Sequence, residues 1–288
     1  MKYKLKSPGS ATIVNAIATG FGSAFGIDLD ITCKGFLTNS EIKCFNDVGA
    51  SNALMERCVN KYFDLFNISK DDYGVSIKTK SSLPMASGLS SSSALSNGVI
   101  ALINKMFSVE FEKPLLSDLE IINLAIEASL EENVTITGAF DDATASYFGG
   151  ITLTDNKQRK IIFKENIGDY CVLIFMPDYI SESGKSDVFK MKLFSPLVNI
   201  AFDLASSGKY FDALNLNGLL YSSALGFDFD IALNALNKGA LASGLSGTGS
   251  SFVAICEDST IDDIKEVWSV YEGNIIESRT NNKGCFFK

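Results

Sequence analysis

Residues 84–94 read PMASGLSSSSA and continue without a break into LSNGVIALINKMF at 95–107. The apolar residues of this second stretch recur at helical spacing, which predicts a helix over 92–107. Gly88 lets the backbone approach a ligand closely, and the N–H groups at a helix start lie unpaired at the positive end of the dipole. The junction therefore predicts a phosphate cradle. A serine-rich linker or an elaborate helix cap is the alternative, but linkers do not usually run straight into a helix.

The serine hydroxyls of the cradle suit the same ligand. Residues 90–93 are four consecutive serines. Their hydroxyls can donate to phosphate oxygens or bind a metal ion that a phosphate carries. The chain contains no G-x-x-x-x-G-K-[ST] sequence, so a P-loop protein is excluded.

The composition limits the classes of function. The 288 residues carry a net charge of −9, which argues against a broad nucleic-acid or anionic-membrane surface. No apolar run approaches the roughly 20 residues needed to cross a bilayer. Six scattered cysteines without a C-x-x-C pair predict reduced thiols in a cytoplasmic protein. The chain has no histidine, so acid–base chemistry falls to Asp, Glu, Lys, Tyr or Cys.

Strand and helix patterns interleave along the chain without a regular βαβ series, which predicts an α+β fold with two lobes dividing near 160–168. Alternating residues predict a strand over 27–38, with 41–45 as a possible hairpin partner. Further strands are expected at 74–79, 151–154, 160–163, 171–177, 251–256, 274–278 and 285–287. Further helices are expected at 52–66, 116–131, 195–207, 210–225, 229–238 and 261–270.

Two further segments carry candidate functional residues. In 126–150, three glutamates end one helix and Asp141 and Asp142 open the next. Such aspartates are commonly helix caps, yet kinases need carboxylates to hold Mg²⁺ and to orient or deprotonate an acceptor hydroxyl. The segment 243–251, SGLSGTGSS, contains three glycines and by itself reads as a tight turn.

Together these segments make the chain similar to the GHMP kinases, the galacto-, homoserine, mevalonate and phosphomevalonate kinases. PMASGLSSSSA resembles their P-x-x-x-G-L-G-S-S-A signature, with Ser90 and Ser93 in place of glycine and alanine. SGLSGTGSS resembles their C-terminal glycine motif, and FDDATASYFGG resembles the segment with the catalytic aspartate. Within the superfamily the archaeal-type shikimate kinases are most similar, because they share these blocks and the N-terminal GSATIVNAIATGFGSAFGIDLD. One departure is Ser10, where the superfamily has lysine after Pro-Gly; Lys6 is the candidate substitute.

The resemblance implies a two-lobed GHMP-kinase-like fold. An S5-domain-2-like ATP-binding lobe would span 1–164 and a ferredoxin-like lobe 165–288. The implied reaction is Mg²⁺- and ATP-dependent phosphorylation of the 3-hydroxyl of shikimate, in aromatic amino-acid biosynthesis. ATP and shikimate would be the partners, with no nucleic acid and no membrane. Another GHMP kinase, such as a homoserine kinase, and a non-catalytic sensor of ATP or a metabolite are the alternatives.

The resemblance also implies site residues. Asp142, seven residues before Gly149, would be catalytic, and Ser92 and Glu131 would bind the metal, with Glu127 left open as a substitute for Glu131. The ATP-binding residues would be Pro84, Met85, Ala86, Ser87, Gly88, Leu89, Ser90, Ser91, Ser92, Ser93 and Ala94. Gly244, Ser246, Gly247 and Gly249 would form a substrate or phosphate loop, and Asn15 would contact the substrate.

The residue that would bind the substrate carboxylate is predicted from side-chain chemistry rather than from the resemblance. Arginine binds a carboxylate through two parallel hydrogen bonds, and the chain has only Arg57, Arg159 and Arg279. Arg57 is the preferred anchor because it lies in the N-terminal half, on the predicted helix 52–66, and a solvated surface charge is the alternative for each of the three arginines.

Overall fold

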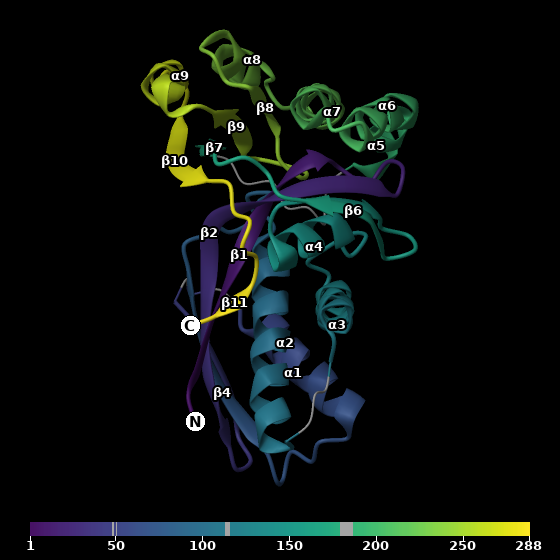
Figure 1. Ribbon diagram of the computed structural model, residues 1–288, viewed down its shortest axis with the longest axis vertical. Helices are drawn as coiled ribbons and strands as arrows, with labels where there is room; N and C mark the ends of the chain where they lie inside the picture. Colours follow the sequence, from purple (N-terminus) through teal and green to yellow (C-terminus); the bar gives the residue numbers. More distant parts are fainter. Residues whose placement is uncertain (48, 50, 113–115, 179–186) are drawn as a thin grey trace.

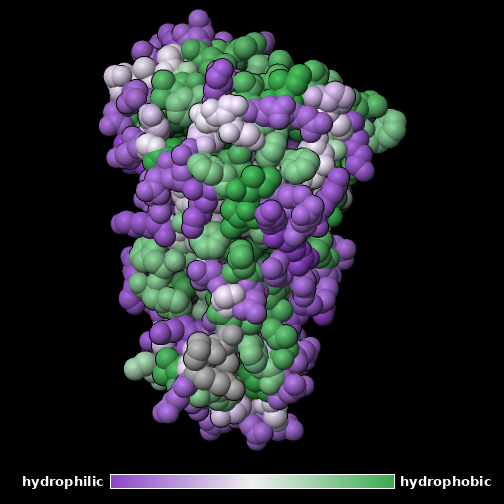
Figure 2. All heavy atoms as spheres, turned by 45° about the vertical axis from the view of Figure 1, so that its right-hand side comes forward, coloured by the Kyte–Doolittle hydropathy of each residue, from purple (hydrophilic) through white to green (hydrophobic). Residues whose placement is uncertain are grey.

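The computed structural model describes residues 1–47, 49, 51–112, 116–178 and 187–288. It is an elongated α+β molecule with two lobes, each built on one sheet (Figure 1). Hydrophobic side chains reach the surface of both lobes on the face shown in Figure 2, with hydrophilic side chains between them. No helix in the described ranges has the length and apolar character to cross a membrane.

The first sheet is organised around one long strand, β2, which pairs with β1 along most of its length, with β5 near its start and with β4 over its second half. The order is β11-β1-β2-β4-β3, and β5 and β6 extend the sheet beside the first part of β2. The strands are β1 (Tyr3–Val14), β2 (Phe21–Thr38), β3 (Ile42–Asn46), β4 (Gly74–Ser81), β5 (Ile151–Asp155), β6 (Lys160–Glu165) and β11 (Phe286–Phe287).

The hairpin expected between 27–38 and 41–45 is wrong. Strand β3 pairs in parallel with β4, with Ile42 opposite Val75, because β4 occupies the edge of β2 that a hairpin would need. Parallel neighbours require a crossover connection, which helix α1 (Ala53–Phe66) supplies between β3 and β4. Both strands could be predicted from the sequence, but not which strand each of them pairs with.

Four helices cover one face of the first sheet (Figure 1). They are α1, α2 (Ser91–Glu110), α3 (Asp118–Glu131) and α4 (Phe140–Phe148). The helices expected over 52–66, 92–107 and 116–131 are therefore confirmed, with ends shifted by a few residues. Helix α2 packs against β1, β2 and all three other helices, and its apolar side chains are buried from Val99 to Ile103. Burial of this helix fixes the position of the loop that precedes it.

The second sheet has the order β10-β7-β9-β8, with its helices gathered on one side (Figure 1). Its strands are β7 (Cys171–Pro177), β8 (Ala242–Leu245), β9 (Phe252–Cys256) and β10 (Gly273–Arg279). Its helices are α5 (Val188–Leu193), α6 (Ser195–Ser206), α7 (Tyr210–Leu225), α8 (Asp230–Asn237) and α9 (Ile261–Trp268). The sequence missed α5 and β8, because six and four residues are too few to show a periodicity.

The chain returns to the first sheet at its end, where β11 pairs with β1. The last segment of the chain therefore touches both lobes, and a division at 164/165 stays a prediction.

Helix α7 lies unusually close to β8. A Cβ atom built on Gly218 would lie 2.5 Å from the Cα of Gly244, and one on Gly244 would lie 2.9 Å from the Cα of Gly218. Real Cβ atoms do not approach backbone that closely, so glycine at both positions sets the distance between helix and strand.

We predict that Gly218→Ala lowers the free energy of unfolding by about 1–3 kcal/mol, the usual cost of overpacking a core. Urea denaturation measures the change. Leu219→Ala is the matched control, since this next residue of α7 is 46% exposed and its truncation should change stability little. Equal stability of the Gly218 variant and the parent would contradict the close packing.

Candidate active site

A cavity of about 500 Å³ opens between the loop before α2, the segment before α4, and the far end of β1. Of the eleven residues predicted to bind ATP, those that line it are Met85, Ala86, Ser87, Gly88, Ser90, Ser91, Ser92 and Ser93. Pro84, Leu89 and Ala94 are not lining residues, and the last two are fully buried in the core. The structure thus brings most of the predicted cradle to one cavity.

The cradle has the backbone that its sequence suggested. Ala86, Gly88 and Ser90 have φ angles of 50°, 76° and 60°, in the left-handed region. The N–H of Ala94 makes a bond of the α-helical pattern to the carbonyl of Ser90, at 2.9 Å. The N–H groups of 91–93 precede it in the first turn, where a helix has no internal partners for its donors. These donors and the helix dipole favour an anion in the cavity.

The C-terminal glycine loop closes against the cradle. A Cβ atom on Gly88 would lie 2.2 Å from the carbonyl oxygen of Ser246, so glycine is required at this contact. The Ser246 hydroxyl donates to the Gly88 carbonyl at 2.8 Å and accepts from the N–H of Thr12 at 3.1 Å. One serine side chain therefore connects the cradle, β1 and the C-terminal lobe.

The other residues predicted in this loop divide into two groups. Gly247 lines the cavity with Asn15, whose Nδ2 donates to the Gly247 carbonyl at 2.9 Å. Gly244 lies in β8 against α7, and a Cβ on Gly249 would meet the ring of Phe227 at 2.6 Å. Gly244 and Gly249 pack closely against other groups and do not line the cavity, and a role of either in binding a ligand stays a prediction.

Asp141 also lines the cavity, but its carboxyl is hydrogen-bonded to groups of the protein. It is 4% exposed in the first turn of α4, and its Oδ1 accepts from Asn156 Nδ2 at 2.7 Å. The backbone N–H of Ala16 donates to it as well. Burial raises the pKa of Asp141, and these hydrogen bonds oppose the rise.

Asp142 differs from its neighbour in having a free acceptor. Its Oδ1 is buried without a hydrogen-bond partner, and the residue lines the cavity. Burial raises the pKa of the Asp142 carboxyl well above its ordinary value, the charge of Asp141 adds to the rise, and a hydrogen bond from Ser90 opposes it. A buried acceptor without a partner is suited to a donor on a ligand.

The predicted metal ligands are not brought together. Ser92 lines the cavity, whereas Glu131 is exposed at the end of α3, where Lys61 Nζ donates to it at 2.5 Å. Glu127 also pairs with Lys61, at 3.6 Å, and with Arg159, at 3.4 Å. The part of the chain that the structure describes contains no group of three His, Cys, Asp or Glu side chains that could hold a metal ion. The resemblance placed Glu131 at the site, but in this structure its side chain joins a surface ion-pair network.

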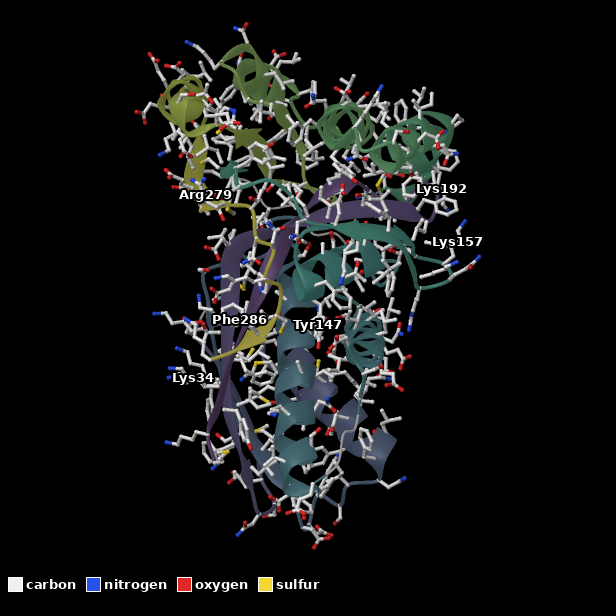
Figure 3. The ribbon with its side chains drawn as sticks, in the orientation of Figure 1. Lys34, Tyr147, Lys157, Lys192, Arg279 and Phe286 are labelled. Atoms are coloured by element: carbon white, nitrogen blue, oxygen red, sulfur yellow. The ribbon has the colours of Figure 1, made fainter. Side chains whose placement is uncertain are left out.

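The predicted substrate anchor Arg57 needs the same correction. Its Nε donates to Glu132 at 2.7 Å on the exposed side of α1, outside the cavity lining. Arg279, which is labelled on the second lobe in Figure 3, forms ion pairs with Asp169 and Asp258. Lys6 pairs with Asp30 rather than reaching the cavity. Among the described residues, no lysine or arginine lines the cavity.

Several lining residues were missed by sequence reasoning. The cavity is also lined by Thr12, the segment 133–137, Asn46, Asp47, Thr79 and Ser81. A polar residue inside an apolar strand was the available signal for Thr12, in SATIV. No local sequence pattern predicts that Thr79 lines the cavity, because its position depends on the pairing of β4 with β3.

Comparison with known proteins shows which family and which fold this chain is similar to. The family model for the GHMP kinases N terminal domain matches residues 53–150, and that for the GHMP kinases C terminal matches 205–272. A protein named shikimate kinase from Methanobrevibacter smithii is 63% identical over 287 residues, covering 100% of this chain and 99% of the relative. Another of that name from Methanothermobacter thermautotrophicus is 46% identical, covering 99% and 97%. The crystal structure of homoserine kinase from Cytophaga hutchinsonii has a TM-score of 0.76 at 17% identity, covering 100% and 97%.

We predict opposite stability changes for the two aspartates. Because burial raises the pKa of Asp142 above its ordinary 3.8, its ionised form opposes folding, increasingly as the pH rises from about 3.8 through the raised value. Asp142→Asn should therefore raise Tm near pH 8, and the gain should shrink on acidification, when the parent carboxyl is protonated. Asp141→Asn should lower Tm, because an amide cannot accept all the hydrogen bonds that Asp141 receives. Melting curves across pH measure both changes, and a Tm loss in the Asp142 variant at every pH would contradict this account.

Proposed function

The chain belongs to the GHMP kinase family, and from this premise we propose that it transfers the γ-phosphoryl group of ATP to the 3-hydroxyl of shikimate. The products would be shikimate 3-phosphate and ADP. The observation that carries the proposal is the similarity to proteins named shikimate kinase along essentially the whole chain. The cavity supports it, because a loop suited to phosphate lines the same cavity as Asp142, whose Oδ1 has no hydrogen-bond partner.

The cradle would bind the phosphates of ATP. Residues 86–93 would contact the β- and γ-phosphates through backbone N–H groups and serine hydroxyls, without a lysine or arginine from the described lining. Phosphoryl transfer passes through a loose transition state, so most of the acceleration comes from positioning and from neutralising charge. The close contact between Gly88 and Ser246 would hold the loop in place while the phosphoryl group moves.

Asp142 would act on the acceptor. Its free Oδ1 would accept a hydrogen bond from the 3-hydroxyl of shikimate, orient that oxygen toward the γ-phosphorus and take its proton at or after transfer. A raised pKa makes the ionised carboxylate a stronger base than an exposed aspartate. Asn15 and Gly247 would contact the rest of the acceptor, because both line the same cavity.

A Mg²⁺ ion would reach this site on the phosphates of ATP. The described side chains provide no three-residue metal cluster, but Mg²⁺ characteristically keeps several waters and needs few protein ligands beside substrate phosphates. Ser92 fits that limited role, because it lines the cavity in the first turn of α2. The bound ion would neutralise charge on the phosphates, and Glu131 is not retained as a ligand.

We predict ADP release with shikimate and not with homoserine, mevalonate or galactose, measured in a coupled assay on this panel. Asp142→Asn should lower kcat by about 10²–10⁴-fold, as loss of a general base typically does, with a smaller change in KM. Asp141→Asn, measured where it remains folded, should lower kcat less. Turnover of another alcohol in place of shikimate would overturn the substrate, and ATP binding without any turnover would favour a sensor.

For the metal site, we predict that Ser92→Ala raises the Mg²⁺ concentration needed for half-maximal ADP release and leaves Tm nearly unchanged. One hydroxyl ligand is lost while the backbone cradle remains. A Mg²⁺ titration of ADP release beside a melting curve measures both effects. Identical Mg²⁺ dependence of variant and parent would remove Ser92 from the metal site.

A further inference from the structure

The side of the first sheet that carries no helices is basic. Helices α1–α4 cover the opposite side (Figure 1), and Lys34, labelled in Figure 3, lies on the open side. Side chains alternate between the two sides along a strand, and residues paired across strands point to the same side. We call the open side of β1, β2, β4 and β3 the outer face. The pairing places six lysines on it: Lys4, Lys6, Lys34, Lys43, Lys78 and Lys80.

Most of this positive charge has no acidic partner in the protein. Lys6 pairs with Asp30, and Lys43 pairs with Glu41 at 2.7 Å. Within the described ranges no ion pair is formed by the other four, Lys4, Lys34, Lys78 and Lys80. The outer face is therefore locally positive in a chain whose net charge is −9.

Three of these lysines form one row across the sheet. Lys34 of β2 lies directly opposite Lys4 of β1 and directly opposite Lys78 of β4. Neighbouring strands are about 4.8 Å apart, and like charges directly opposite each other are destabilising. Lysine often protects the edge of a sheet, but β2 and β4 have partner strands on both sides. A negatively charged ligand would remove the repulsion that edge protection does not explain.

Aromatic rings lie between the lysines. Phe45 of β3 is directly opposite Lys78 and 52% exposed, and Phe36 of β2 is two residues from Lys34 and 38% exposed. Lys2 Nζ lies over the Phe36 ring, 5.9 Å from its centre, so the face of this ring is open to an approaching group. A lysine side chain reaches farther from a sheet than a phenylalanine ring does. The outer face thus suits a ligand with a row of negative charges and with planar groups that reach between them.

The phosphates and bases of a single-stranded nucleic acid have this chemistry, because phosphates bind lysine and bases stack on aromatic rings. An acidic peptide offers charges without a regular series of planar groups. A membrane surface needs apolar side chains that enter it, whereas here the charges extend beyond the rings.

The outer face is separate from the cavity. Thr79 and Ser81 of β4 line the cavity, and Lys78 and Lys80 alternate with them along the same strand. A ligand on the outer face would therefore leave the cavity open.

We propose that the outer face binds a single-stranded nucleic acid. Lys4, Lys34 and Lys78 contact its phosphates, and Phe36 and Phe45 stack on its bases. The net charge predicts no broad nucleic-acid surface, but the charge is unevenly distributed, and this local surface is positive.

Fluorescence anisotropy of labelled oligouridylate RNA and oligothymidylate DNA, each about 12 nucleotides long, tests the proposal with the full chain. Binding should have a dissociation constant of about 10⁻⁶–10⁻⁴ M and should weaken between about 50 and 200 mM salt. The tighter of the two ligands identifies the nucleic acid. No binding of either at about 50 mM salt would overturn the proposal.

The row is tested by the triple variant Lys4→Gln, Lys34→Gln and Lys78→Gln. Affinity at about 50 mM salt should fall about tenfold or more, and the slope of log K against log salt should become shallower by about 2, for three lost phosphate contacts. The variant should melt at the parent temperature or higher, because repulsion is relieved.

The matched control changes the net charge equally, by replacing three exposed lysines of α2, α5 and the start of α7 with glutamine: Lys105, Lys192 and Lys209. It should bind like the parent. An equal loss of affinity in both triple variants would show an effect of overall charge and overturn the site.

The rings are tested by Phe45→Ala, which should lower affinity about 5- to 150-fold, the effect of one stacked base, without changing the salt slope. Phe163→Ala is its control, since Phe163 is 46% exposed on β6, at the other end of the sheet. It should bind like the parent, and unchanged binding by the Phe45 variant would overturn the stacking.

Three further probes separate other ligands. Polyglutamate bound as tightly as the oligonucleotides would indicate an acidic protein, and binding of phosphatidylserine-containing vesicles without oligonucleotide binding would indicate a membrane. A DNA duplex of the same length bound as tightly as the single strands would show that bases do not reach the rings. Each of these results would overturn the proposal.

Discussion

The contact between Gly88 and the carbonyl of Ser246 is the constraint on which the cavity depends. A Cβ atom at position 88 would lie 2.2 Å from this oxygen. Residue 88 also has a left-handed φ of 76°, which favours glycine. The Ser246 hydroxyl also donates to the Gly88 carbonyl and accepts from the N–H of Thr12, so the same contact is connected to β1. Because the two contact partners belong to different lobes, the conformation of the phosphate cradle depends on both. A loop with donors but without this contact would lack a fixed place relative to Asp142.

The two adjacent aspartates show how one environment produces two kinds of carboxylate. Both are removed from solvent, and burial raises the pKa of each. Asp141 receives hydrogen bonds from Asn156 and from the backbone of Ala16, which hold the start of α4 against the β1–β2 connection. Asp142 retains an unpartnered oxygen beside the cavity. We therefore assign a stabilising role to Asp141 and the proposed chemical role to Asp142, which lie in the same turn of α4.

Local signals in the sequence predicted a large part of this arrangement. The cradle and the helix after it follow from glycine, serine and helical spacing, whereas the choice of Asp142 over Asp141 came from the resemblance to the GHMP kinases. The pairing of β3 with β4 could not be predicted, because it depends on which edge of β2 is already occupied. Neither Glu131, which the resemblance implied, nor Arg57, which was chosen as an arginine of the N-terminal half, lines the cavity, because position on a helix does not specify which neighbour a charged side chain will meet. Here both joined surface ion pairs.

The most direct test of the account is a crystal structure of the protein with a non-hydrolysable ATP analogue and shikimate. The account predicts the terminal phosphates against residues 86–93 and the 3-hydroxyl of shikimate within hydrogen-bond distance of Asp142 Oδ1. Shikimate bound elsewhere, or with another of its hydroxyls against Asp142, would contradict it.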